Sequence, residues 1–418
     1  MRLRRTRSSH SGWWVVTGGS VLLMLQNGLI ISAFGAYLVV ITADTGWAPG
    51  VIAFGYAIVQ LGNGFLSPLT GWCCDRLGVR AVARAGTVVT AGGFALAAAA
   101  ADASHLVGGI VVIALGCSAA GITPLTVAVV QTMTARRTLA LGLLPTGIAV
   151  GGLAVPLVAW ALAATGWRAT FAGIAVVILV VGQLACSSLP SGRAPRAACV
   201  REVPAASRRD HDLASALRTS AFWLLVVGHG TALVAVSAVS LHLVPLMTHH
   251  HGTSLALAGL TVAMMSIAQL VGQIVTGLVG DRIDQRVLAA VCMVVQTAVL
   301  VALALLPGTA LAMAAAVVHG VAWGLRGPVM TALRSDYFGI ASFGAIMGWS
   351  MGLVSIGLVV GPLLVTAMVD GAAGYPAAFL VLAAVTAVGA VAFTVLRRPR
   401  RPVSERIAEG DRDLLVPE

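Results

Sequence analysis

The residues best suited to bind a ligand lie close together inside one long apolar run. His319, Trp323 and Arg326 follow one another at i, i+4 and i+7, a spacing that places them on one face of a helix. An arginine offers a fork of donors to a carboxylate, a tryptophan offers a flat surface, and a histidine donates a hydrogen bond or takes up a proton. These side chains predict a binding wall for a small organic anion.

A guanidinium inside such a run needs water, an acceptor or an anion, because it keeps its proton in proteins. We expect Arg326 to reach a water-filled cavity. The alternative is a structural charge bonded to backbone carbonyls near the helix break that Pro328 introduces. His229 and His242 fit packing roles better than a shared ligand site, since their spacing separates them by about 20 Å along a helix.

The positions of the acidic residues also favour an anionic ligand. All 15 Asp and Glu residues fall in polar segments or at the ends of apolar runs, so we expect no carboxylate deep in a bilayer. An electropositive site without an acid disfavours cationic solutes and metal ions. We assign no metal to the run His249-His250-His251. We also predict no cofactor, and the chain has no Lys and therefore no P-loop for a nucleotide.

Twelve apolar stretches must position these residues. Hydrophobic residues make up 58% of the chain and charged residues 10%, whereas a soluble domain carries about 25% charged residues. The runs are continuous rather than alternating and long enough to cross about 30 Å of hydrocarbon as helices. We therefore predict an all-α membrane protein with twelve transmembrane helices. The predicted spans are 13–42, 47–71, 81–101, 106–133, 139–164, 168–189, 221–247, 255–279, 287–306, 310–333, 343–369 and 374–396.

The placement of arginine predicts the orientation in the membrane. All 26 basic residues are Arg, and cytoplasmic loops retain such residues. With both termini inside, nearly all of them, Arg334 included, fall on the cytoplasmic side, while Arg168 falls outside and Arg326 within a span. We predict a multi-pass protein of the cell inner (plasma) membrane with cytoplasmic N- and C-termini. Contact with anionic membrane lipid explains the net charge of +11, so we predict no nucleic-acid partner.

An internal duplication divides the chain into halves. Shifting the first half by 206 positions places Gly71 on Gly277, Asp75 on Asp281, Arg80 on Arg286 and Pro156 on Pro362. This constant offset predicts two homologous bundles facing each other. The predicted domains are a cytoplasmic arm (1–12), an N-terminal six-helix bundle (13–189), a cytoplasmic linker (190–220), a C-terminal six-helix bundle (221–396) and a cytoplasmic tail (397–418).

The loop Gly71-Trp72-Cys73-Cys74-Asp75-Arg76-Leu77-Gly78-Val79-Arg80 resembles the loop 2/3 signature of the major facilitator superfamily, and residues 277–286 resemble its copy in loop 8/9. The resemblance implies two pseudo-symmetric six-helix bundles that alternate access to a central site. It also implies gating by carboxylates that pair with arginines at the cytoplasmic face. The other interpretation is a turn that only sets topology. The predicted gating residues are Gly71, Asp75, Arg76, Gly78, Arg80, Asp281 and Arg282.

Within that superfamily the chain resembles the branch of oxalate/formate antiporters and monocarboxylate transporter-like carriers. The resemblance rests on Gly12-Trp13-Trp14, on Arg136-Arg137 followed by Ala140-Leu141-Gly142, on Gly166-Trp167-Arg168 and on Arg326-Gly327-Pro328. It implies a cavity lined by helices 1, 4, 7 and 10, so Gln26 and Asn27 of helix 1 join the predicted substrate-binding residues. The chain departs from this branch in helix 8 (255–279), which has no Arg.

We therefore expect a secondary active or facilitative transporter and not an enzyme. The predicted cargo is a small organic anion, a mono- or dicarboxylate, moved by alternating access through a monomer. A proton or a counter-anion is the expected coupling partner. The alternative is an exporter of hydrophobic drugs or of a secondary metabolite, in which Arg326 is structural and the cavity walls are apolar.

Overall fold

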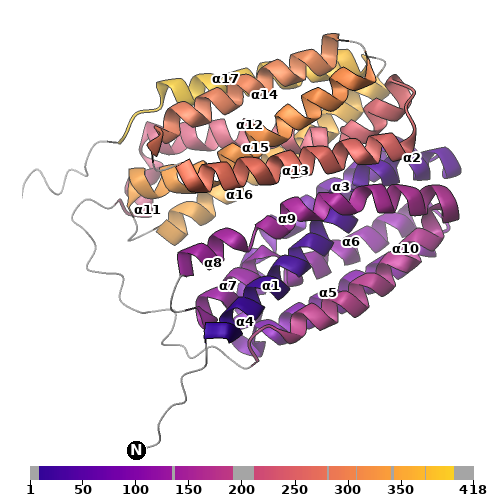
Figure 1. Cartoon of the computed structure of the whole chain (residues 1–418), viewed down its shortest axis with the longest axis horizontal. Helices are drawn as coiled ribbons and strands as arrows, with labels where there is room; N and C mark the ends of the chain where they lie inside the picture. The colour runs from indigo at the N-terminus through magenta and orange to yellow at the C-terminus, as the bar shows by residue number, and fades with distance from the viewer. Residues whose placement is uncertain are drawn as a thin grey trace, which may run out of the picture.

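In a computed structural model the described residues form helices and the connections between them (Figure 1). It describes residues 9–133, 137–191, 211–279, 282–306, 308–339, 343–371 and 373–399. The first half contains α1 (Ser9–Gln26), η1 (Asn27–Ile31), α2 (Phe34–Thr45), α3 (Pro49–Phe65), α4 (Ser67–Leu77), α5 (Val79–Ala98), α6 (Ala103–Ala120), α7 (Ile122–Thr132), α8 (Arg137–Leu143), α9 (Thr146–Gly151), η2 (Gly152–Ala154) and α10 (Val155–Ser187). The second half contains α11 (Leu213–Leu217), α12 (Ser220–Pro245), η4 (Leu246–His250), α13 (Leu255–Val279), α14 (Gln285–Leu305), α15 (Thr309–Phe338), α16 (Phe343–Asp370) and α17 (Gly374–Val395).

The described residues contain ten helical segments that are long and apolar enough to cross a membrane. One of them, Ala140–Ser187, holds two crossings, because Gly166 turns the chain with a φ of 76° inside α10. One more crossing is formed by α3 and α4 together, which have 17 and 11 residues when counted separately. The described part of the chain thus holds the predicted twelve crossings, and the all-α membrane fold is confirmed.

The crossings form two bundles of the same design (Figure 1). In the N-terminal bundle α5 packs on α6 and α10, α3 packs on α6, and α1 packs on α9. In the C-terminal bundle α14 packs on α15 and α17, α13 packs on α15, and α12 packs on α16. Each pairing in the first bundle has its counterpart in the second, as a duplicated six-helix unit requires.

The two bundles meet at one end and diverge at the other. At the closed end a Cβ on Gly35 of α2 would lie 2.5 Å from the backbone oxygen of Leu241 in α12, and one on Gly50 of α3 would lie 4.0 Å from a carboxylate oxygen of Asp370 in α16. At the opposite end α4, α8 and α11 pack mainly on helices of their own bundle. Figure 1 shows this divergence on its left side. The described conformation is therefore closed at one end only.

Helix α15 runs beyond the span predicted for it. The sequence-based span ended at residue 333 and left Arg334 in a loop, but α15 continues to Phe338 and Arg334 is only 1% exposed. The helix ends where Gly339 takes a φ of 78°, a conformation that glycine adopts without strain. The prediction was wrong because it took an arginine as the mark of the membrane surface.

Candidate functional site

Arg326 is held inside the C-terminal bundle. Its side chain is 1% exposed, and its Nη1 donates to Oε1 of Gln296 at 2.5 Å and approaches the sulfur of Met293 at 3.4 Å. Both partners belong to α14. The expectation that a water-filled cavity solvates this guanidinium is therefore wrong for the described conformation, because an amide and a thioether of a neighbouring helix replace the water.

Close packing of α15 on α13 sets the direction of Arg326. A Cβ on Gly320 or on Gly324 would overlap the backbone oxygen of Met265 or of Gln269, respectively. The glycine face of α15 therefore lies directly against α13. Because each residue of a helix turns by about 100°, Arg326 follows Gly324 by about 200° and faces away from α13.

The predicted binding wall is presented only in part. His319 is completely buried, and Arg326 is nearly so. Trp323 is half-buried, and Gly327, one turn further along the same face, is exposed. Of the three predicted wall residues, Trp323 is thus the one that offers surface to a ligand in this conformation.

Arg326, Gln296 and His319 form a polar group that we call the Arg326 cluster. Nε of Arg326, Nε2 of Gln296 and both ring nitrogens of His319 are buried without a hydrogen-bond partner. The arginine and amide nitrogens can only donate, and the ion pairs among the described residues join exposed side chains elsewhere. The described interior of this bundle therefore holds donors and a positive charge without a carboxylate, an arrangement that an anion or a water molecule would satisfy.

A second buried arginine was missed by the sequence analysis. Arg334 donates from Nε to Oγ of Ser350 at 2.9 Å, from Nη1 to the backbone oxygen of Met330 at 2.8 Å, and from Nη2 to Nδ1 of His229 at 3.1 Å. Because an arginine can only donate, His229 must accept at Nδ1, and its ring is neutral while this bond exists. His229 therefore has a packing role, as predicted from the sequence, and its hydrogen bond with Arg334 helps to join α12, α15 and α16. Gly339, a helix-ending residue, is the sequence signal that places Arg334 inside α15.

This link makes a testable prediction for stability. His229→Leu removes the acceptor and leaves one buried N–H of Arg334 unpaired, which costs about 1–3 kcal/mol. In an Arg334→Met protein, His229→Leu should lower the free energy of unfolding clearly less than it does in the wild-type chain. The difference, which is the coupling energy of the pair, should be about 1–2 kcal/mol. The measurement is the denaturation midpoint of the two single variants and the double variant in the same detergent. Strictly additive losses would contradict the contact.

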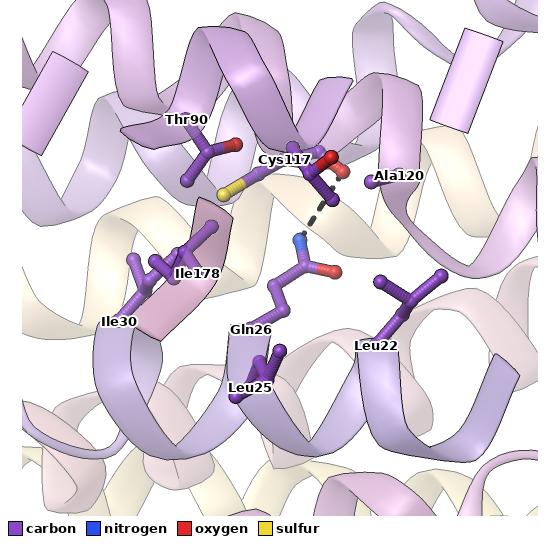
Figure 2. A pocket seen from close by; sticks show the side chains of 9 residues that line it. Leu22, Leu25, Gln26, Ile30, Thr90, Cys117, Ala120 and Ile178 are labelled. Atoms are coloured by element: carbon purple, nitrogen blue, oxygen red, sulfur yellow. Dashed lines mark hydrogen bonds between the residues drawn. The ribbon is translucent and has the colours of Figure 1, made fainter. Parts of the chain in front are cut away.

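Gln26 lines a pocket inside the N-terminal bundle. The pocket is small and is walled by side chains of α1, η1, α5, α6 and α10 (Figure 2). Nε2 of Gln26 donates to Oδ1 of Asn63 at 2.9 Å and to the backbone oxygen of Cys117 at 3.4 Å. Gln26 therefore joins α1 to α3 and α6.

Asn27 begins a π-helical turn in the first crossing. Its Nδ2 donates to the backbone oxygen of Ile148 at 2.7 Å and to Oγ of Ser32 at 2.9 Å, while the backbone of Ser32 closes the turn onto the oxygen of Asn27. Turns of this kind occur frequently at functional sites. Both helix 1 amides are bonded within the N-terminal bundle, so the described conformation does not bring Gln26 or Asn27 to the Arg326 cluster.

The predicted gating residues that the structure describes lie where the bundles diverge. They are Gly71, Arg76, Gly78, Arg80 and Arg282, together with the backbone of Asp75. Gly78 ends α4 with a φ of 86°, and the guanidinium of Arg76 lies 4.4 Å from the ring centroid of Trp72. Asp281 and the side chain of Asp75 lie outside the described residues. Pairing of these carboxylates across the face stays a prediction.

Arg80 makes a contact that the duplication repeats. Its Nε donates to the backbone oxygen of Leu189 at 2.7 Å, and Nη1 of Arg286 donates to the backbone oxygen of Leu396 at 2.9 Å. Each bond joins the start of the third membrane crossing of a bundle (α5 or α14) to the end of the sixth (α10 or α17). The last carbonyls of a helix lack partners within the helix, and a positive charge is favourable there. In this conformation Arg80 therefore holds its own bundle together and does not reach across to the other.

Arg80→Gln should consequently lower thermal stability. The lost charge-assisted bond is worth about 1.5–3 kcal/mol, and Arg286→Gln should cost a similar amount. Unfolding temperatures of the two purified variants test this equivalence. A variant with unchanged stability but a shifted ratio of open and closed states, measured by a distance probe across the bundles, would show that Arg80 acts as a gate instead.

The architecture defines a membrane carrier built of two matched six-helix bundles. The chain belongs to the Major Facilitator Superfamily, whose model matches residues 19–243 and 225–416. It is therefore a multi-pass membrane transporter and not an enzyme, as predicted.

The curated relatives include two monocarboxylate transporters. Monocarboxylate transporter 13 of Bos taurus is 26% identical over 277 residues, covering 65% of this chain and 62% of that protein. The same transporter of Rattus norvegicus is 28% identical over 196 residues, covering 45% of this chain and 44% of that protein. MFS-type transporter pytF of Aspergillus terreus is 28% identical over 154 residues, covering 35% of this chain and 48% of that protein. The chain thus spans less than two thirds of these relatives, and the predicted resemblance to the monocarboxylate transporter-like branch is confirmed.

Solved structures share the fold at low identity. A bacterial homolog of the human lysosomal transporter Spinster, in an inward-facing and occupied conformation, superposes with a TM-score of 0.71 at 14% identity, covering 93% of this chain and 96% of that one. The unoccupied inward-facing form gives a TM-score of 0.70 at 15% identity, with coverages of 93% and 97%. These matches support the two-bundle fold alone.

Proposed function

We propose that this transporter carries a small organic anion, a mono- or dicarboxylate, by alternating access of the two bundles. The observation that carries the proposal is the buried positive charge of Arg326 and Arg334, with which no carboxylate of the described C-terminal bundle forms an ion pair. The names of the bovine and rat relatives agree with a monocarboxylate cargo. Trp323 supplies the apolar surface against which the carbon skeleton of such an anion would lie.

The two arginines act on a bound anion through their electric field. They are eight residues apart on α15, so about 12 Å along the helix axis. At an effective dielectric constant of about 20, each charge stabilises a carboxylate 10 Å away by about 1.7 kcal/mol and destabilises a cation equally. The walls around the site are protein and lipid, which screen this field less than bulk water does. Selection for anions therefore does not require direct contact with either guanidinium.

The remaining assignments belong to the same proposal. We place both termini in the cytoplasm of a cell with this carrier in its plasma membrane, so that the diverging end of the bundles opens inward. Domain boundaries follow the ranges predicted above, the working unit is a monomer, and a proton or a counter-anion couples to transport. The signature residues around Gly71 and Asp75 control the opening at that end.

A counterflow assay tests the cargo. In separate reactions, liposomes that contain the purified protein are loaded with an unlabelled mono- or dicarboxylate, organic cation or hydrophobic dye, and uptake of the same solute in labelled form is measured. Uptake of carboxylates alone is the expected result. Uptake of an organic cation without uptake of any carboxylate would refute the proposal.

A second candidate, an exporter of hydrophobic compounds, is favoured by the sealing of Arg326. In that case the ligand would contact Trp323 and apolar neighbours, and the charge would have no effect on it. Efflux of a neutral dye that persists in Arg326→Gln would identify this function.

A further inference from the structure

We propose that a groove on the outer surface of the C-terminal bundle binds one anionic phospholipid. The groove lies between α14 and α17 and is open on one side. Apolar side chains such as Val287, Val291 and Phe393 line it, and Arg286 lies at the end nearest the start of α14. This site is separate from the Arg326 cluster, and the inference does not depend on the transported substrate.

The apolar part of the groove fits an acyl chain. Val287, Val291 and Val294 are 48%, 52% and 57% exposed, and their spacing of i, i+4 and i+7 aligns them on one face of α14. The row rises about 10 Å along the helix, which is roughly two thirds of the depth of one leaflet of a bilayer. Because these valines belong to a membrane-crossing helix, the occupant of the groove is a lipid tail.

Arginines gather at the mouth of the groove. Arg286 is half-buried there and donates to the backbone of Leu396, while Arg397 and Arg398, which follow directly, are exposed. Arg398 also donates to the backbone oxygen of Asp336 at 2.9 Å. Guanidinium groups match phosphate oxygens in a bidentate geometry and hold anionic headgroups at the membrane surface.

The nearby carboxylates leave part of this charge available. Asp284 accepts from the backbone nitrogens of Arg286 and Val287 at 2.9 and 3.2 Å, so it caps α14. Asp336 is exposed at the end of α15. Among the described residues, three arginines at the mouth therefore face two carboxylates, which leaves one positive charge for the phosphate of a lipid headgroup.

The matching region of the N-terminal bundle lacks these features. The shift of 206 positions places Arg84 opposite Ala290, so a charge stands where the groove is apolar. Leu189, which accepts from Arg80 as Leu396 accepts from Arg286, is followed directly by Pro190 and Ser191 and not by arginines. The groove with its arginines is thus a property of this half of the chain and not of the fold in general.

The test compares lipid preference of the full chain and three variants. Thermal stability in neutral detergent is measured while phosphatidylglycerol or phosphatidylcholine is titrated. The wild-type chain should respond to phosphatidylglycerol at lower concentration. Arg397→Gln/Arg398→Gln should reduce that preference by about 25-fold, since each surface arginine contributes about fivefold. Val291→Trp, which fills the groove, should reduce it although no charge changes.

Arg84→Gln is the matched control, because it removes an exposed arginine from the equivalent helix of the other bundle. It should keep the full lipid preference. Equal responses to both lipids in the wild-type chain would overturn the proposal, as would full preference in Val291→Trp. Glycerol phosphate without acyl chains should have no effect, and stabilisation by it would show a surface anion site without a lipid tail.

Discussion

Arg326→Gln is expected to weaken binding of the transported anion by about 30-fold, because one unit charge at about 8 Å contributes about 2 kcal/mol at an effective dielectric constant of 20. Arg326→Lys should retain most of the affinity, since it keeps the charge and loses only the fork. Arg84→Gln, which removes an exposed arginine, should bind as the wild-type chain does. Equilibrium binding of a labelled carboxylate to purified protein gives all three values.

Stability separates this electrostatic role from a structural one. A buried charge without a carboxylate partner is unfavourable, so its removal is neutral or stabilising when the replacement packs well. Arg326→Gln should therefore keep its unfolding temperature while it loses anion affinity. A large fall in unfolding temperature with unchanged affinity would show that Arg326 only supports the bundle. Strong loss in Arg326→Lys as well would indicate direct bidentate contact with the cargo in another conformation.

Gly324→Ala should be among the most damaging small substitutions in the chain. The new Cβ would overlap the backbone oxygen of Gln269, and two backbones cannot yield as a flexible side chain does. Overpacking of this kind costs about 1–3 kcal/mol or more, which corresponds to a fall in unfolding temperature of roughly 1–4 °C or more in a chain of this length. Transport should fall as well, because the same contact orients Arg326.

Gly327→Ala provides the matched control on the same helix. A Cβ at that position meets nothing within 4 Å, and alanine is favoured over glycine inside a helix by about 1 kcal/mol. The two variants should therefore move the unfolding temperature in opposite directions. If Gly324→Ala were as stable as the wild-type chain, the close approach of α15 to α13 would be wrong.

Helix number and duplication were accessible from the sequence because the bilayer leaves few choices. A backbone in hydrocarbon must satisfy its own hydrogen bonds, so a long apolar run forms a helix. The predicted spans 255–279 and 374–396 agree with α13 and α17 to within a residue. The constant shift that relates Arg80 to Arg286 also predicted matched bundles, and both arginines cap the same type of helix end.

The sequence by itself determined that this is a twelve-crossing carrier of two related halves, and that His319, Trp323 and Arg326 share a helical face. Only the tertiary structure decided what covers that face. In a membrane both lipid and neighbouring helices are apolar, so hydrophobicity does not distinguish the surfaces that meet them. Contact of Gly320 and Gly324 with α13 turned Arg326 toward Gln296, and Arg334 became buried because His229 and Ser350 supplied partners from two other helices.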